Sequence, residues 1–291
     1  MLPPESLEAL DCMIWLGSEA NAGCLTNFSQ STICRRAKQA TSIFKIRLAK
    51  AGGEWNTYPN STLLTLERQV HQLFRFAHER TLRLESDHWA GRQLISTLPT
   101  PWAHGRAGRI GIQRPMQLLR ERVIDAWITC TKADLPEPSN PTYISYELAT
   151  MPLMIACAGN HPLGQIGQLS AGDLQQFPSL SVANHHYPMF AAQMQAKGTW
   201  NTPQAMNNYS YDRWEGQALQ NLYTIPINTL SNPLDNGRLI PLDFDLRIND
   251  CIALVIRRDI SEQPAIHQLL DHLQQQLHNL ALEHPQLSTL N

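Results

Sequence analysis

The sequence lacks an excess of charge of either sign, because 23 Lys and Arg residues stand against 25 Asp and Glu residues and the formal net charge is -2. This balance excludes a uniformly basic protein that coats nucleic acid by bulk electrostatics. Any contact with a polyanion therefore has to be local.

The sequence also lacks cysteines at metal or redox spacing. The six cysteines form no CxxC pair, are widely separated, and several lie inside apolar runs: Cys12, Cys24, Cys34, Cys130, Cys157 and Cys251. Buried free thiols in a reducing compartment explain this usage better than a disulfide framework or a zinc site does.

Targeting and membrane-spanning segments are not predicted. The N-terminal MLPPESLEALD has neither a basic n-region nor a long apolar h-region, and no apolar run approaches the length needed to cross a bilayer. We expect a soluble, cytoplasmic protein. The 291 residues, 43% of them apolar, are enough for one small domain and one larger one.

Acidic residues are absent between Glu19 and Glu54. The segment between them contains six cations without an acid to neutralise them: Arg35, Arg36, Lys38, Lys45, Arg47 and Lys50. This local excess makes the segment the candidate for contact with a polyanion.

The same segment contains a helix predicted over 29–40. Ser29 is a good N-cap, and Phe28 before it can pack on Ile33 as a hydrophobic staple. Apolar residues at helical spacing predict a buried stripe of Ile33, Ala37, Ala40 and Phe44. Two shorter helical patterns precede it, which predicts a helix-turn-helix whose last helix enters the DNA major groove by its N-terminal end. We expect KAGGEWNTYPN (50–60) to form a hairpin wing.

From residue 63 the apolar spacing changes to that of a coiled coil. The residues alternate three and four apart, with Ser61 or Thr62 as the cap: Leu63, Leu66, Val70, Leu73 and Ala77. Such a seam predicts pairing of two chains. The pattern equally permits a helix that lies on its own domain, because Leu64 and Phe74 widen the stripe.

Beyond Arg80, short apolar runs alternate with helical patterns. The runs are RIGI (109–112), AWITC (126–130), LMIACA (153–158) and CIALVI (251–256). Strands separated by helices predict a largely parallel sheet flanked by helices. We expect the last helix to begin at Ser261, with Pro264 in its first turn, and LPEPSNP (135–141) to mark a crossing between two lobes.

At SQSTICRRA (29–37) the sequence resembles the LysR-type transcriptional regulators, whose recognition helix starts with Ser-Gln and turns basic. MPLMIACAGNHPL (151–163) and LSAGDLQQFPSL (169–180) resemble the strand, His-Pro-Leu turn and Asp-Leu helix of that family's effector domain. LLRERVIDAWI (118–128) and DNGRLIPLDF (235–244) are similar to other stretches of that domain. The chain departs from the family pattern after the recognition helix, where Lys45 stands in place of a usual Gly, so it resembles a divergent member.

The resemblance implies an α/β protein with an N-terminal all-α winged helix-turn-helix domain, a linker helix and a two-lobed, periplasmic-binding-protein-like effector domain. We expect residues 1–60 to form the DNA-binding domain, 61–80 the linker helix, and 81–291 the effector domain. Lobe 1 would comprise about 81–135 and 248–291, and lobe 2 about 141–245. The resemblance also implies a homodimer through the linker helix, often assembled into a homotetramer.

The positions of residues on the predicted helix and wing indicate which of them contact double-stranded DNA. Base or phosphate contacts are expected from Ser29, Gln30, Ser31, Thr32, Arg35, Arg36, Lys38, Lys45, Arg47 and Lys50. A solvated basic helix face is the alternative. Strand ends collect ligands in open α/β sheets, so we expect a small-molecule effector at Ser86, Asp87, Gln113, Arg114 and Thr131.

Catalysis is not predicted. GRAGRIG (105–111) does not follow a clear strand in the sequence, so a phosphate-binding loop is not expected. His185 and His186 lack a carboxylate or Cys at metal spacing, and no Gly-x-Ser-x-Gly motif occurs. We therefore expect no catalytic residue, no metal and no cofactor. The rival hypothesis is a small-molecule binding protein or enzyme on the two-lobed fold whose N-terminal domain no longer binds DNA.

Overall fold

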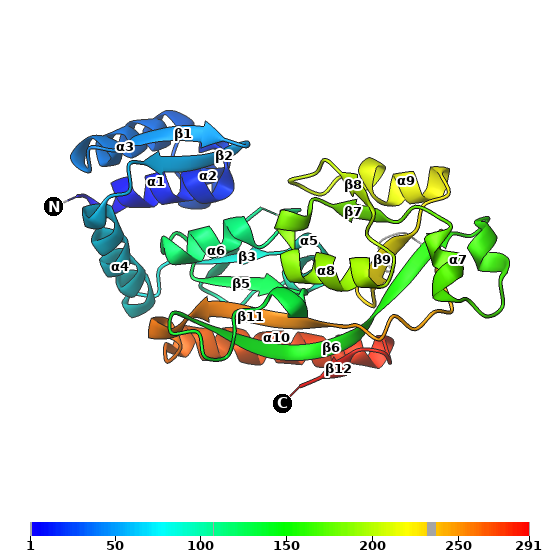
Figure 1. The fold of residues 1–291 in the computed structure, drawn as a ribbon. Helices are drawn as coiled ribbons and strands as arrows, with labels where there is room; N and C mark the ends of the chain where they lie inside the picture. The colour runs from blue at the N-terminus through cyan, green and yellow to red at the C-terminus, as the bar shows by residue number, and fades with distance from the viewer. Residues whose placement is uncertain (1, 107, 232–236, 291) are drawn as a thin grey trace. The chain divides into compact units, whose positions relative to one another are not determined.

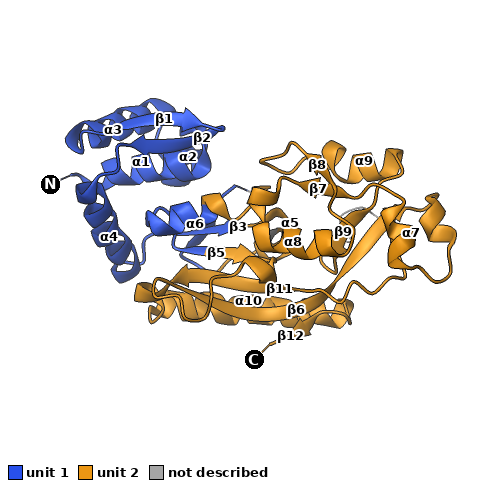
Figure 2. Cartoon of the chain, in the orientation of Figure 1, with its two compact units in different colours: residues 1–85, 100–106, 115–126 blue, residues 86–99, 107–114, 127–291 orange. Residues whose placement is uncertain are grey.

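The computed structural model describes residues 2–106, 108–231 and 237–290, and the chain divides into two compact units (Figure 2). Unit 1 comprises Met1–Glu85, Thr100–Arg106 and Pro115–Ala126, and unit 2 comprises Ser86–Pro99, Ala107–Arg114 and Trp127–Asn291. Asp235 and Asn236, at the start of the stretch 235–244, lie outside the described residues.

Unit 1 begins with the predicted winged helix-turn-helix (Figure 1). Its elements are α1 (Pro4–Leu16), α2 (Glu19–Thr26), α3 (Gln30–Ile43), β1 (Arg47–Ala51) and β2 (Glu54–Tyr58). The two strands pair antiparallel and form the wing. Gly52 and Gly53 make its turn, both with positive φ, the conformation that a two-residue hairpin turn requires.

Helix α3 forms where the sequence predicts it and runs three residues further. The hydroxyl of Ser29 accepts a hydrogen bond from the backbone N–H of Thr32 at 3.2 Å, as an N-cap should. The stripe of Ile33, Ala37 and Ala40 is buried. Two residues after the helix, Lys45 has a φ of 53°, in the left-handed region that favours glycine.

Unit 1 continues with α4 (Thr62–Ala77), capped by the Ser61 hydroxyl, which accepts from the backbone N–H of Leu64. It is completed by β3 (Leu82–Ser86), β4 (Trp102–His104) and most of α6 (Gln113–Arg120). The strands β3 and β4 pair parallel. Helix α4 is therefore a single capped helix over the range predicted for the linker.

Unit 2 is built around one long strand, β6 (Tyr143–Ala158). It pairs antiparallel with β9 (Ile225–Asn228), β10 (Leu239–Pro241), β11 (Asn249–Arg257) and β12 (Ser288–Thr289). The expectation of a largely parallel sheet was wrong for this unit. Only the last third of β6 is a continuous apolar run, so the sequence shows neither its length nor its antiparallel partners.

The described residues of unit 2 also form one short strand before β6, a parallel pair of strands after it, and five α-helices. The strands are β5 (Ala126–Thr129), β7 (Leu180–Val182) and β8 (Thr202–Gln204), of which β7 and β8 pair parallel. The helices are α5 (His88–Leu94), α7 (Ala171–Gln175), α8 (Pro188–Ala196), α9 (Glu215–Gln220) and α10 (Pro264–Glu283). Helix α10 starts at Pro264 rather than Ser261, with Gln263 as its N-cap. In the described part of the chain, no helix is long and apolar enough to span a membrane.

The strand predicted at 109–112 is absent, and this expectation was wrong. Gly108 and Gly111 both have positive φ, which an extended strand does not tolerate, and the backbone N–H of Gly111 donates to the hydroxyl of Tyr187 at 2.9 Å. The strand of this region is β4, directly before Gly105. A Cβ at Gly105 would overlap the Trp15 indole nitrogen, so close packing accounts for this glycine.

Candidate nucleic-acid interface and ligand pocket

The first turn of α3 presents polar side chains to solvent. Ser29, Gln30 and Ser31 are exposed, and one turn further Arg35 and Lys38 are exposed as well. Thr32 is half-buried, and its hydroxyl lies 2.9 Å from that of Ser29. The exposed tip of a capped helix is the part that can reach base edges in a major groove.

Arg36 differs from its neighbour Arg35. Its guanidinium carbon lies 4.0 Å from the centre of the Phe28 ring, and the side chain is half-buried. This contact places the Arg36 charge against the aromatic residue that precedes the helix, where a cation over a ring is stabilised. Of the two adjacent arginines, Arg35 is the one that faces solvent.

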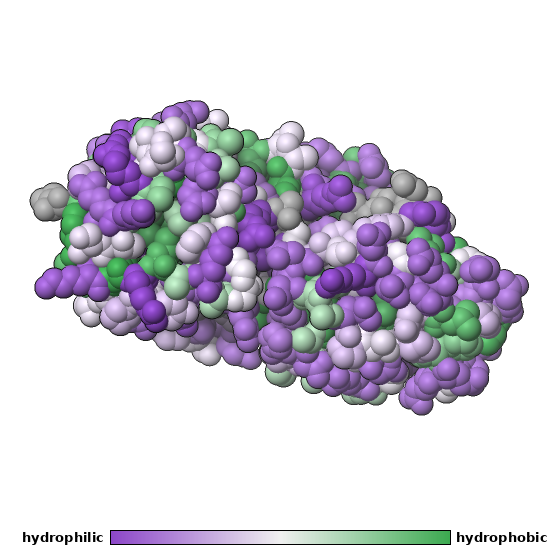
Figure 3. Space-filling view, turned by 90° about the horizontal axis from the view of Figure 1, so that it is seen from above, coloured by the Kyte–Doolittle hydropathy of each residue, from purple (hydrophilic) through white to green (hydrophobic). Residues whose placement is uncertain are grey.

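The wing and the short connection from α3 to it carry further cations that are exposed. Lys45, Arg47 and Lys50 all face solvent. Lys50 Nζ lies 4.8 Å from the Trp55 ring centre, and the Arg47 guanidinium lies 5.7 Å from that of Tyr58. Seen from above, the side of unit 1 with α3 and the wing is largely hydrophilic (Figure 3). The predicted DNA residues thus share one winged helix-turn-helix, with α3 and the wing each contributing cations.

Helix α4 has its apolar side outward. Val70 is 62% exposed, Leu63 57% and Leu66 55%, and Leu73 and Ala77 are also exposed. The residues on the other side of the helix are buried, and they are largely polar: Leu64, Arg68, Gln72 and Arg75. This reversal of the usual pattern leaves the predicted seam available for a partner.

Three carboxylates within unit 1 hold that polar side of α4: Asp11 and Asp125 are buried and Glu121 is half-buried. Arg68 Nε donates to Asp11 of α1 at 2.8 Å, and its Nη1 to Glu121 at 2.9 Å. Arg75 donates to Asp125 at 2.7 Å. These charge-assisted hydrogen bonds explain why the helix can turn its cations inward and its leucines outward.

Unit 2 contains a pocket walled by aromatic side chains. Trp89 comes from α5, Phe190 from α8 with Tyr187 just before it, Trp200 follows α8, and Trp214 precedes α9. The backbone of Trp200 has a φ of 62°, which a bulky residue rarely adopts. Such local strain is typical of functional sites.

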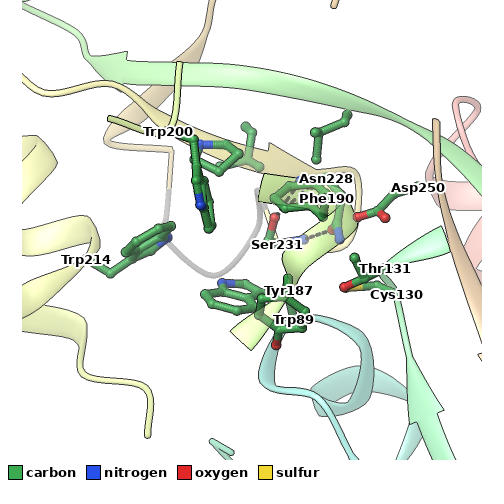
Figure 4. A pocket seen from close by; sticks show the side chains of 13 residues that line it. Trp89, Cys130, Thr131, Tyr187, Phe190, Trp200, Trp214, Asn228, Ser231 and Asp250 are labelled. Atoms are coloured by element: carbon green, nitrogen blue, oxygen red, sulfur yellow. Dashed lines mark hydrogen bonds between the residues drawn. The ribbon is translucent and has the colours of Figure 1, made fainter. Parts of the chain in front are cut away.

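Polar groups close the other side of this pocket. Figure 4 shows Trp89, Trp200 and Trp214 on one side and Thr131 and Asp250 on the other. Asn228 and Ser231 complete the polar part, and the Ser231 backbone N–H donates to the Asn228 amide oxygen at 2.9 Å. That bond fixes the orientation of the Asn228 side-chain amide at the pocket.

Among the described residues that line the pocket, Asp250 is the one with an ionisable carboxyl, and it is 5% exposed. Burial raises the pKa of its carboxyl to about 7, against hydrogen bonds from the Lys132 backbone, the Asn228 side chain, the Cys251 backbone and the Cys130 thiol, which lower it. Burial also raises the pKa of the Tyr187 hydroxyl. The pocket therefore holds a carboxyl that ionises near neutrality.

The residues predicted to bind an effector are not gathered in one place. Thr131 lines the aromatic pocket, whereas Ser86 and Asp87 line a separate hollow of about 290 Å³ with His88, Arg92, Ile95, Gly108 and Tyr209. Asp87 is buried and accepts a hydrogen bond from the Thr129 hydroxyl at 2.5 Å. At the start of α6, Gln113 is exposed and Arg114 half-buried.

Sequence reasoning missed Asp250 and the five aromatic residues. The available signal was the position of Asp250 directly before the apolar run CIALVI, which becomes β11. The aromatic residues lie far apart in the sequence and share no spacing. Only the fold brings them to one pocket.

Comparison with known proteins gives one family model. Residues 111–278, more than half of the chain, match the LysR substrate binding domain. A search of characterised protein sequences gives no significant match.

Solved structures resemble the chain along most of its length. A full-length OxyR variant from Pseudomonas aeruginosa is 14% identical with a TM-score of 0.57, covering 94% of this chain and 98% of that one. ArgP from Mycobacterium tuberculosis is 16% identical with a TM-score of 0.52, covering 95% and 97%. The regulatory domain of MetR, a LysR family regulator from N. meningitidis, is 13% identical with a TM-score of 0.54, covering 72% and 100%. At these identities the likeness concerns the fold.

Proposed function

The chain belongs to the LysR family of transcriptional regulators, and from that premise we propose that it is a sequence-specific DNA-binding regulator controlled by a small molecule bound in its two-lobed domain. Residues 1–60 form its DNA-binding domain, 61–80 its linker helix and 81–291 its effector domain. It acts by binding rather than by catalysis.

The observation that carries the DNA-binding proposal is the exposed tip of α3 in a segment without acids. Gln30 can bond an adenine edge in the major groove, and the Thr32 methyl can contact a thymine methyl. Arg35 is exposed and can reach a guanine or a phosphate. Cations of α3 and the wing, namely Lys38, Lys45, Arg47 and Lys50, contact phosphates and fix the register.

Dimerisation through α4 is supported by the exposed apolar seam. An apolar helix face of this length is stabilised when a second copy covers it in a coiled coil. Two chains joined in this way would present two recognition helices to one side of the DNA. We therefore expect two half-sites in each operator, and further assembly to a tetramer is consistent with the family.

Effector control is supported by the pocket in unit 2, whose lining residues other than Trp89 lie within the stretch that matches the family's substrate binding domain. A bound ligand stabilises the conformations of the domain that bind it most tightly. That shift in population changes the affinity of the dimer for its operator.

Gel retardation on the DNA upstream of the chain's own coding region tests the proposal, with random-sequence DNA of equal length as the control. We expect retardation of the upstream DNA, with an affinity that falls about a thousandfold or more between roughly 50 and 200 mM salt, because several phosphates are neutralised. Equal affinity for both DNAs, or no retardation at low salt, would favour the rival function, a ligand-binding protein without DNA affinity.

A further inference from the structure

The aromatic side chains of the pocket form a closed ring. Ring centres lie 6.2 Å apart for Trp89 and Tyr187, 6.5 Å for Tyr187 and Phe190, and 5.2 Å for Phe190 and Trp200. The ring centres of Trp200 and Trp214 lie 6.0 Å apart, and those of Trp214 and Trp89 lie 5.6 Å apart, so the five rings form a closed series. Each pair is tilted or edge-on, as in the walls of a cage.

The charge inside this cage is negative. Among the described residues that line the pocket, Asp250 is the one with a formal charge, and none is Lys, Arg or His. The groups that hold Asp250 are neutral hydrogen-bond donors, namely the Asn228 amide, the Cys130 thiol and two backbone N–H groups.

A cation is attracted both by the aromatic rings and by the Asp250 carboxylate. The faces of aromatic rings carry negative charge density and attract a cation, most strongly when water is excluded. A buried carboxylate is costly until a positive charge compensates it. An anionic ligand would meet repulsion from both, and an uncharged ligand would form no ion pair with Asp250.

The size of the pocket limits the group that enters it. Its volume is about 40 Å³, which corresponds to roughly three water molecules. That space suits an ammonium or a small methylated ammonium, with the remainder of the ligand outside.

We propose that the pocket binds the positively charged nitrogen of an organic amine, with Asp250 as its counter-ion and the five aromatic rings as its cage. The proposal deepens the proposed function, on which it rests, by assigning the effector to the class of organic cations. Trp200 and Trp214 supply ring faces, and Thr131 and Ser231 supply polar contacts at the opposite side.

Titration of the full-length protein without DNA tests this assignment, with quenching of tryptophan fluorescence and calorimetry as readouts. The probes are choline against its uncharged isostere 3,3-dimethylbutan-1-ol, and butylamine against butanol and butyrate. We expect each cation to bind at least about tenfold more tightly than its uncharged isostere, and butyrate to bind most weakly. This comparison uses the natural sequence and does not depend on a variant that folds.

Two variants locate the binding. Asp250→Asn keeps the side-chain volume and should bring cation affinity down to that of the isosteres, whereas Asp271→Asn, at an exposed position of α10, should leave it unchanged. Equal binding of cations and isosteres, tighter binding of butyrate, unchanged affinity of Asp250→Asn, or no cation binding up to about 10 mM would each overturn the assignment. Because no DNA is present, this failure is separate from a failure to bind an operator.

Discussion

Arg68 of α4 and Asp11 of α1 form a buried ion pair, with 2.7 Å between Arg68 Nη2 and Asp11 Oδ1 and side chains 3% and 2% exposed. The pair joins α4 to α1, the first helix of the same unit. It also explains the orientation of α4, because a helix with its arginines held inward must present its opposite, apolar side to solvent.

Removing one partner of this pair should destabilise unit 1. Arg68→Met leaves the buried Asp11 with the longer contact to Arg83, at 3.8 Å, so we expect a loss of up to about 3–5 kcal/mol in the free energy of unfolding, measured by urea denaturation. The double variant Arg68→Met with Asp11→Leu removes both charges and should recover a large part of this loss. A single variant as stable as the parent would show that the pair contributes nothing.

Charging the exposed seam of α4 should prevent dimerisation. Val70→Glu places a carboxylate at the centre of the proposed coiled coil, where desolvation of the charge opposes pairing. Thr65→Glu on the same helix is exposed but lies off the seam, and serves as the matched control. Sedimentation equilibrium should show a smaller assembly for Val70→Glu alone. If both variants assemble as the parent does, the seam is not the interface.

The left-handed backbone at Lys45 predicts a stabilising substitution. An L-residue in this conformation costs about 1–2 kcal/mol relative to glycine, partly offset by the greater freedom of glycine in the unfolded chain. Lys45→Gly should therefore unfold at a higher temperature in calorimetry, with a gain of about 0.5–1 kcal/mol. The DNA affinity of this variant should depend less steeply on salt concentration, because one phosphate contact is lost. A lower unfolding temperature would contradict the backbone argument.

The ionisation of Asp250 predicts a pH dependence of ligand binding. Burial raises the pKa of this carboxyl to about 7, so it is neutral below that pH and charged above it. Burial raises the pKa values of the neighbouring Cys130 and Cys251 thiols and of the Tyr187 hydroxyl, so these groups stay neutral across this range. Asp87 is a second carboxyl in this region, close to Cys130 and Tyr187.

Choline carries a permanent charge, so its affinity should rise with pH through about 7 and level off above it. The Asp250→Asn variant should show a flat profile between about pH 5.5 and 8.5. Calorimetric titration at several pH values measures both. A flat profile in the parent protein would show that another group neutralises the cation.

The winged helix-turn-helix could be predicted from the sequence because its signals are local. The cap at Ser29, the apolar spacing of α3 and the glycine pair of the wing each act within a few residues. Such short-range signals can be recognised without knowledge of the tertiary contacts. The exposure of the α4 seam was one of two open alternatives, and only remote partners such as Asp11 decide between them.

The ligand pocket could not be predicted because its parts are remote from one another in the sequence. Trp89 and Trp214 lie 125 positions apart, and neither belongs to a motif. The assignment of 109–112 to a strand failed for a related reason, because the amide of Gly111 is held by the Tyr187 hydroxyl from a distant segment. Apolar composition alone does not separate a strand from such a loop.

The most direct test of the account is the salt dependence of operator binding in Arg35→Ala, measured by fluorescence anisotropy against the parent chain and against Arg120→Ala, an exposed arginine of α6. We predict that Arg35→Ala weakens operator binding by about 1–3 kcal/mol. If the partner of Arg35 is a phosphate, the slope of log affinity against log salt concentration should also be smaller by about one. The Arg120→Ala variant should match the parent in both quantities. Arg35→Ala with the affinity and slope of the parent chain would contradict the claim that the tip of α3 contacts DNA.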